Sequence, residues 1–221
     1  MNQIPDALIF DLDGTLVDSE EPGMDVLYEE ALKLGVPITR EQAHAEFRGR
    51  RMAECIDYIA TRMTRVPAEF EGDFAPRFTA HVRQTQAQRF RADLSAMPGA
   101  LALVARLERP FCIATNGPRE KAELTLGLTG LLPWFEGRLY SAYEVGSFKP
   151  DPGLFLHAAQ ALGVAPAHCA VVEDSLPGIA AGLAAGMQVH ALCPPENVPA
   201  DLAAGVRFIA SLEELDQALH G

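Results

Sequence analysis

The sequence predicts an α/β protein, with a Rossmann-like parallel sheet as its core and an inserted all-helical domain. Short apolar runs alternate with segments of helical spacing over most of the chain, whereas residues 18–94 read as helical throughout. Acidic and polar residues also follow directly after several of the apolar runs. Strands that alternate with helices form a parallel sheet with both faces covered.

The predicted strands are short apolar runs. The first run, "DALIF" at Asp6–Phe10, leads straight into acids, as a buried parallel strand does when its end opens into a site. Four further runs have the same character: Phe111–Thr115, Cys169–Asp174, Met187–Leu192 and Val206–Ala210. The segments of helical spacing are Gly99–Glu108, Arg119–Leu128, Pro152–Leu162, Leu176–Ala185 and Leu212–Leu219.

An insertion follows the first strand. Its segments "GMDVLYEEALKLG", "TREQAHAEFRG" and "MAECIDYIATRM" have helical character and predict a small bundle. The stretch "LSAMPGA" at Leu94–Ala100 contains Pro98 and Gly99 and predicts the return to the sheet. We therefore expect a core of residues 1–17 and 95–221 and an inserted domain of residues 18–94.

Composition limits the possible partners and location. Hydrophobic residues make up 48% of the chain, which argues against disorder. The formal net charge of -12 makes nucleic acid and anionic membranes poor partners. The four cysteines contain no C-x-x-C pair, and the N-terminus has no signal-peptide pattern. The small-residue spacing of "GIAAGLAAG" is too short for a membrane span and predicts a helix lying close against the sheet. A cytoplasmic protein with reduced thiols is expected.

The stretch "DLDGT" at Asp11–Thr15 places two acids behind the first strand. An EF-hand is excluded because its fifth position would be Thr15 and its glycine comes fourth instead of sixth. A surface turn explains Asp13 and Gly14 but leaves Asp11 unexplained at the mouth of a buried strand. A catalytic loop remains the alternative.

Three other polar segments, "ATNG", "FKPDP" and "VVEDS", lie at or just after strand-like runs. The carboxyl ends of parallel strands share one crevice, so these segments should converge there with "DLDGT". Each has an ordinary structural explanation by itself. Lys149 is explained as a solvated loop lysine, Thr115 and Asn116 as helix-capping residues, and Glu173 with Asp174 as acids favouring a helix start.

Taken together, these motifs resemble the haloacid dehalogenase superfamily of phosphohydrolases, in the branch with a helical cap inserted after the first strand. "DLDGT" matches the first motif, Thr115 with Asn116 the second, Lys149 the third, and Glu173 with Asp174 the fourth. The four occur in this order, and the likeness spans essentially the whole chain.

The resemblance implies a role for each acid. Asp11 would attack phosphorus and form an aspartyl phosphate, and Asp13 would act as the acid and base. The side chains of Asp11 and Asp174 and the backbone carbonyl of Asp13 would hold Mg²⁺, with Glu173 ligating it directly or through water.

The remaining motif residues would bind the transferred group. Thr115 and the backbone N–H of Asn116 would grip the phosphoryl oxygens, and Lys149 would lie between the nucleophile and the phosphate. The resemblance therefore implies a phosphatase that acts on a small phosphorylated metabolite.

Other activities within the superfamily fit the sequence less well. Dehalogenases need neither an acid at Asp13 nor the metal. Phosphonate-cleaving members use a cap lysine, and nothing around Lys33 marks it as reactive. Sugar phosphomutases of the β-phosphoglucomutase type carry a cap histidine where this chain has Gly23. A non-catalytic metal-binding protein would not require both Asp11 and Asp13.

The cap stretch "FRGRR" at Phe47–Arg51 gives a hypothesis about the substrate. Exposed arginines at helix ends are common, so their cluster also has an ordinary explanation. In the functional interpretation, one or more of Arg48, Arg50 and Arg51 pair with a second anionic group of the substrate, since guanidinium pairs well with carboxylate. Gly49 and Arg51 match the cap pattern of the phosphatases named next, and Arg50 is an addition to it. The pattern is similar to phosphatases acting on 6-phosphogluconate and related sugar phosphates. We expect a monomer or weak homo-oligomer.

Overall fold

The computed structural model describes residues 4–220 and divides the chain into two compact units. The core unit combines the segment up to Asp18 with everything from Ser95 onward, and the cap unit is Ser19–Leu94. These bounds differ by one residue from the domains expected from the sequence. The two units are described separately below.

Six strands of the described residues form one parallel sheet in the core unit. They are β1 (Ala7–Phe10), β2 (Phe111–Thr115), β3 (Leu139–Ser141), β4 (Cys169–Glu173), β5 (Gln188–Ala191) and β6 (Val206–Phe208). Their order across the sheet is β3-β2-β1-β4-β5-β6, and each neighbouring pair runs parallel. The predicted α/β fold is confirmed.

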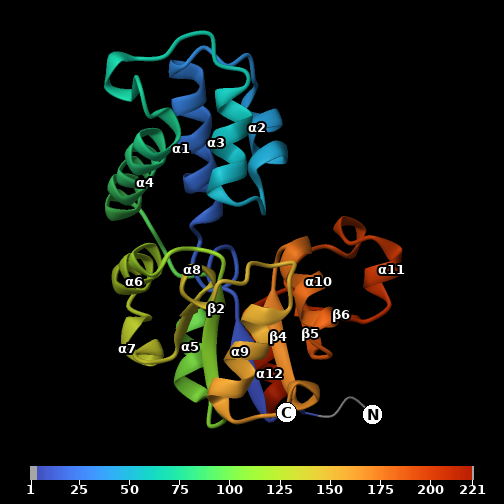
Figure 1. Cartoon of the computed structure of the whole chain (residues 1–221). Helices are drawn as coiled ribbons and strands as arrows, with labels where there is room; N and C mark the ends of the chain where they lie inside the picture. Colours follow the sequence, from blue (N-terminus) through green and yellow to red (C-terminus); the bar gives the residue numbers. More distant parts are fainter. Residues whose placement is uncertain (1–3, 221) are drawn as a thin grey trace. The chain divides into compact units, whose positions relative to one another are not determined.

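Helices cover both faces of this sheet, which is why its central strands are buried throughout and mostly apolar (Figure 1). On one face, α9 (Gly153–Leu162) and α10 (Leu176–Ala184) pack against Ile9 and Val171. The other face carries α7 (Leu132–Phe135), whose Phe135 ring lies edge-on to Phe10 at 6.4 Å. The remaining helices of the core unit are α5 (Ala100–Arg106), α6 (Arg119–Leu128), α8 (Ala142–Val145), α11 (Ala200–Ala203) and α12 (Leu212–His220).

The glycine pattern on α10 brings this helix close to the sheet, as the sequence predicted. A Cβ at Gly182 would lie 2.8 Å from a methyl group of Val189 on β5.

No helix in residues 4–220 is long and apolar enough to cross a membrane. The four cysteines are free, and three of them are buried.

The cap unit is a helical bundle. Its helices are α1 (Glu20–Lys33), α2 (Arg40–Phe47), α3 (Met52–Ala60) and α4 (Phe74–Ala92), with a 3₁₀ turn, η1, at Ala68–Phe70. Phe47, Ile56 and Phe78 belong to its buried core. Helix α2 begins at a capping box, in which the Thr39 hydroxyl accepts from the backbone N–H of Gln42 and the Gln42 side chain accepts in return.

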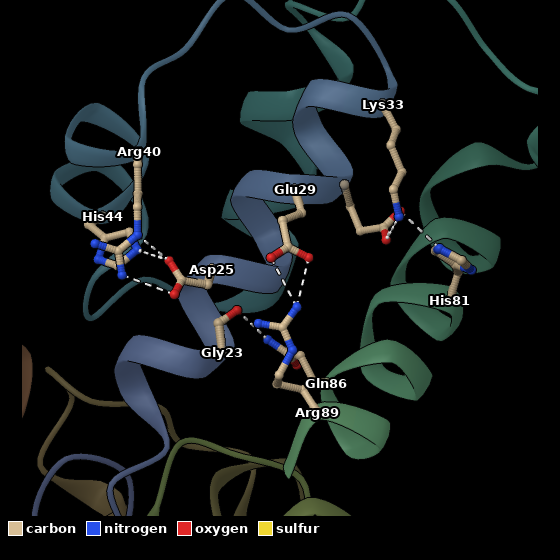
Figure 2. Close-up of polar contacts among 10 residues, drawn as sticks. Gly23, Asp25, Glu29, Lys33, Arg40, His44, His81, Gln86 and Arg89 are labelled. Carbon is tan, nitrogen blue, oxygen red and sulfur yellow. Dashed lines mark hydrogen bonds and ion pairs between the residues drawn. The ribbon is translucent and has the colours of Figure 1, made fainter. Parts of the chain in front are cut away.

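Polar contacts tie α1 to its neighbours on two sides (Figure 2). Towards α2, Asp25 accepts hydrogen bonds from Arg40 at 2.6 and 2.9 Å. Towards α4, the Glu29 carboxylate accepts from Arg89 at 2.8 and 2.9 Å. The buried Gln86 side chain of α4 also donates to the backbone carbonyl of Gly23 at 3.0 Å.

Candidate active site

Three charged side chains from three loops meet at the carboxyl edge of the sheet. Lys149 Nζ lies 2.5 Å from Asp11 Oδ1 and 2.7 Å from Glu173 Oε1. Asp11 directly follows β1, Glu173 ends β4, and Lys149 enters on the loop after α8. The parallel register brings these elements together, because β1 and β4 are neighbours and end at the same edge.

The side chain of Asn116 fixes the Lys149 segment. Its Oδ1 accepts from the backbone N–H of Lys149 at 2.9 Å, and its Nδ2 donates to the Lys149 carbonyl at 3.2 Å. Asn116 follows β2, so this amide joins the end of β2 to the lysine loop. We therefore assign the Asn116 side chain to positioning Lys149. The phosphate-binding role that the family resemblance implies concerns the backbone N–H of Asn116, not its side chain.

Both carboxylate oxygens of Glu173 accept hydrogen bonds from the protein. Its Oε1 accepts from Lys149, and its Oε2 accepts from the backbone N–H and the hydroxyl of Ser175 at 2.9 and 2.8 Å. Gly178 leaves the necessary space, because a Cβ there would fall 1.8 Å from Glu173 Oε1. This buried carboxylate is arranged to hold Lys149.

Three acids are placed to hold a cation. Asp11, Glu173 and Asp174 each offer one oxygen, and these oxygens lie within 4.8 Å of one another. Thr15 Oγ1 donates to Asp174 Oδ1 at 2.9 Å. Gly14 has a φ of +82°, and a Cβ there would meet Asp174 Oδ2 at 2.4 Å, so the loop requires glycine at this position. An all-oxygen donor set suits a hard divalent cation such as Mg²⁺.

Burial shifts the pKa of the nucleophile candidate. Desolvation raises the pKa of Asp11 to about 8, despite the opposing charge of Lys149, and the nearby Glu173 adds to the rise. Burial alone would lower the pKa of Lys149, but the charges of Asp11 and Glu173 outweigh it and raise that pKa. Lys149 therefore stays protonated, and the crowded carboxylates need further positive charge to ionise together.

The second acid has a lysine partner of its own. Asp13 Oδ1 lies 2.8 Å from Nζ of Lys121, which is on α6. The Thr115 hydroxyl accepts from the backbone N–H of Gly117 at 3.0 Å. A Cβ at Gly117 would lie 3.3 Å from that hydroxyl oxygen and 3.6 Å from Asp13 Oδ2. Thr115 and Asp13 thus approach the same glycine from two loops.

Sequence reasoning missed Lys121 and Ser175. Ser175 carries a weak signal, since serine before an apolar helix is a typical N-cap, and its hydroxyl does accept from Gly178 N–H. Lys121 carries a compositional signal. The chain has only three lysines among its 18 basic residues, and Lys121 and Lys149 are the two that lie in the core unit.

The cap residues of the substrate hypothesis lie in the other unit. Gly49 has a φ of +71° between the ends of α2 and α3. Arg50 pairs with Glu46 at 2.7 Å, and Arg51 pairs with Glu54 at 2.7 Å. Both guanidinium groups therefore already have a carboxylate partner within the cap unit.

The model of the haloacid dehalogenase-like hydrolases matches residues 5–186 of the chain. The chain belongs to this family. The predicted resemblance is confirmed, and the match covers β1 and the loops that carry Asp11, Lys149 and Asp174.

Two curated relatives from Escherichia coli K12 are phosphatases. 6-Phosphogluconate phosphatase is 34% identical over 88% of this chain and 86% of its own length. Hexitol phosphatase A is 34% identical over 96% of this chain and 89% of its own length. Among solved structures, a family hydrolase from Deinococcus radiodurans with bound phosphate and sodium is 32% identical, with a TM-score of 0.74 over 98% of this chain and 96% of its own. The predicted enzyme class, a phosphatase-type hydrolase, is confirmed.

Proposed function

We propose that the chain is a Mg²⁺-dependent phosphatase that hydrolyses a sugar or sugar-acid phosphate through an aspartyl-phosphate intermediate. The contact of Lys149 with Asp11 carries the proposal. It places a cation directly on the carboxylate that follows β1, and a second acid, Asp13, stands two residues further along. The phosphatase relatives support the reaction class.

In the first step, an oxygen of Asp11 forms a bond to phosphorus while the bond from phosphorus to the ester oxygen breaks. Asp13 gives its proton to the departing oxygen, so the product leaves as a neutral alcohol. Lys149 lies against Asp11 and faces the charge of the phosphoryl group. The Thr115 hydroxyl and the backbone N–H of Asn116 orient the phosphoryl oxygens.

In the second step, a water oxygen forms a bond to phosphorus and the bond to Asp11 breaks. The water proton passes to Asp13, which returns the enzyme to its starting protonation state. The sum is one phosphate ester and one water converted to one alcohol and one phosphate. Splitting hydrolysis in this way needs the same carboxyl group as acid and then as base.

We assign Mg²⁺ to Asp11, Asp174 and the backbone carbonyl of Asp13. When bound, it supplies the positive charge that lets the carboxylates and the phosphoryl group share one crevice. The oxygen-rich cluster supports this assignment. Glu173 fits better as the residue that holds Lys149, since both of its oxygens already accept from protein donors.

The proposed substrate class rests on the cap and on the relatives. Arg50 and Arg51 are about half exposed, at 46% and 49%, and would pair with a carboxylate of a sugar acid such as 6-phosphogluconate. That pairing has to compete with Glu46 and Glu54. The names of two relatives support this substrate class. 6-Phosphogluconate carries a carboxylate besides its phosphate, whereas a hexitol phosphate carries none.

Water as the phosphoryl acceptor fits better than a second hydroxyl of the sugar. The mutases carry a histidine at the position of Gly23. Here a Cβ at that position would already lie 3.4 Å from Gln86 Nε2 and 3.7 Å from the Phe90 ring. The backbone carbonyl of Gly23 also accepts from the Gln86 side chain. A histidine here would have to fit beside this buried amide and the Phe90 ring.

The test is phosphate release from a panel of sugar and sugar-acid phosphates, with Mg²⁺ and with excess chelator. We expect release that depends on Mg²⁺ and an acid-stable amount of ³²P bound to the protein after quenching. Isomerisation of a sugar phosphate without phosphate release would favour the mutase. Mg²⁺ binding without turnover of any ester would favour a binding protein and overturn the proposal.

A further inference from the structure

We propose that Lys121 is a positioning residue for Asp13, the acid and base of the reaction. This inference rests on the proposed function and deepens it. No motif of the family resemblance includes Lys121. The observation that carries it is the 2.8 Å contact between Lys121 Nζ and Asp13 Oδ1.

The distribution of lysines singles out this contact. Of 18 basic residues, 15 are arginines, and arginine makes most of the ion pairs described in the cap. Lysine occurs three times, and the two lysines of the core unit each contact an acid of the "DLDGT" loop, Lys149 at Asp11 and Lys121 at Asp13. An ammonium group is a compact charge on a flexible stem, which suits a narrow space between carboxylates better than a planar guanidinium.

The surroundings of the pair restrict where the Asp13 side chain can lie. Lys121 is the third residue of α6, a helix that begins just after β2 and its Thr115. Gly117 lies between them, and a Cβ there would be 3.6 Å from Asp13 Oδ2 and 3.9 Å from Lys121 Cδ. The two side chains are also only partly exposed, at 21% for Asp13 and 29% for Lys121. The helix start therefore presents the lysine to one oxygen of the acid.

The two lysines of the core unit thus pair with different acids of the site. Lys149 is shared by Asp11 and Glu173, whereas Lys121 serves Asp13. The contact with Lys121 would then hold the Asp13 carboxyl group in the orientation that the reaction requires. Asp13 would hand its proton to the leaving oxygen in the first step and receive the proton of water in the second. Loss of Lys121 should leave both reactions possible but the acid poorly oriented for each.

The test compares two esters that differ in their need for a proton. An alkyl ester needs protonation of its leaving oxygen, whereas 4-nitrophenyl phosphate expels a stable phenolate without it. The ratio kcat/KM reports the first step, so Lys121→Met should lower kcat/KM by roughly ten- to a hundredfold for the best sugar phosphate and by less than about threefold for 4-nitrophenyl phosphate. Its kcat on 4-nitrophenyl phosphate should fall, with a burst of one phenolate per enzyme, because the water step still needs Asp13.

Three further variants test the interpretation. Lys121→Arg should recover part of the activity on the sugar phosphate, and Lys33→Met should change neither ester. Lys33 is the matched control, because it makes a similar contact of 2.7 Å with Glu30 in the cap unit. Lys121→Gln provides a second neutral variant if the Met variant folds poorly.

An equal loss of kcat/KM on both esters, or no loss on either, would overturn the role of Lys121. If the unmodified enzyme released phosphate from neither ester, the proposed function itself would fail. If Asp11→Asn kept its turnover, the aspartyl-phosphate mechanism would fail regardless of the Lys121 result.

Discussion

The Lys149 cluster of the core unit and two ion pairs between helices of the cap unit differ in burial. In the core, Lys149 is 2% exposed and is shared by two acids, of which Glu173 is 1% exposed. In the cap, Arg40 pairs with Asp25 and Arg89 with Glu29 at positions that are 24–50% exposed. Exposed pairs of this kind contribute at most about 1 kcal/mol each. The buried cluster costs desolvation energy, which the exposed pairs of the cap largely avoid.

The histidines differ in whether they have a polar partner. In the cap, His44 lies 2.8 Å from Asp25 and His81 lies 3.0 Å from Glu30. In the core, His190 on β5 is buried, and neither ring nitrogen has a hydrogen-bond partner among the described residues. The core unit also pairs histidines with carboxylates, His168 with Asp6 and His220 with Asp216, both at 2.9 Å. The contrast therefore lies between His190 and these paired histidines, not between the two units.

The largest effect is expected from the nucleophile itself. Asp11→Asn should lower turnover by roughly a thousandfold or more, because the amide cannot form the phosphoryl intermediate. Without a divalent ion, the melting temperature of this variant should not fall. The substitution replaces a buried carboxyl group whose ionised form is disfavoured by burial. Steady-state rates and thermal unfolding of the same preparation check both parts. Retained turnover would refute the assignment of Asp11.

A direct comparison of the two kinds of ion pair comes next. Lys149→Met should destabilise the metal-free protein by about 3 kcal/mol, because two buried carboxylates lose their cation. Arg89→Met in the cap should cost at most about 1 kcal/mol, because the Glu29 pair is solvated. Urea unfolding of both variants measures the difference.

The double variant Lys149→Met/Glu173→Gln separates stability from function in this cluster. It should recover part of the lost stability, because only one buried carboxylate remains, while activity stays low. Equal costs for Lys149→Met and Arg89→Met would show that burial does not distinguish the core cluster from the cap pairs.

The buried histidine predicts a pH effect on stability. Burial, with a smaller contribution from Arg207, lowers the pKa of His190 from 6.5 to about 4. The unfolded chain therefore binds the proton more readily, and the stabilisation is present above pH 6.5 and lost as pH falls towards 4. The loss should amount to roughly 3 kcal/mol. His190→Phe should flatten unfolding free energy between pH 7 and 4 relative to the unmodified protein, whereas an unchanged slope would assign the effect to other groups.

The sequence predicted the sheet well because its central strands are buried on both faces and therefore mostly apolar. It missed β3, whose three residues Leu139–Ser141 lie at the edge of the sheet and form no apolar run. The short helices α7 and α8, of four residues each, were missed for the same reason. Elements this short carry too few residues for a periodic pattern.

The sequence predicted those parts of the site that lie at the ends of strands. Asp11, Thr115 and Glu173 lie on β1, β2 and β4 or directly after them, so the parallel topology brings these chain positions to one edge. The partner of each side chain does not follow from such a rule. Lys121 reaches Asp13 from a helix start, and Asn116 turns its amide to the Lys149 backbone instead of a ligand. Both depend on side-chain orientation, which spacing along the chain does not encode.

The smallest effect concerns the arginines of the cap. The side-chain and backbone hydrogen bonds of Arg51 lower the pKa of Glu54, so this carboxylate competes with any substrate acid for the guanidinium. Glu54→Gln should lower KM for 6-phosphogluconate by about threefold, and Arg51→Met should raise it by a similar factor, since exposed pairs contribute under 1 kcal/mol. KM for glucose 6-phosphate should stay constant in both variants, because that sugar has no carboxylate. Arg62→Met is the control, since this cap arginine lies over the Tyr58 ring at 3.8 Å. Parallel shifts for both sugars would assign the pair to cap structure and leave the acid group of the substrate to another residue.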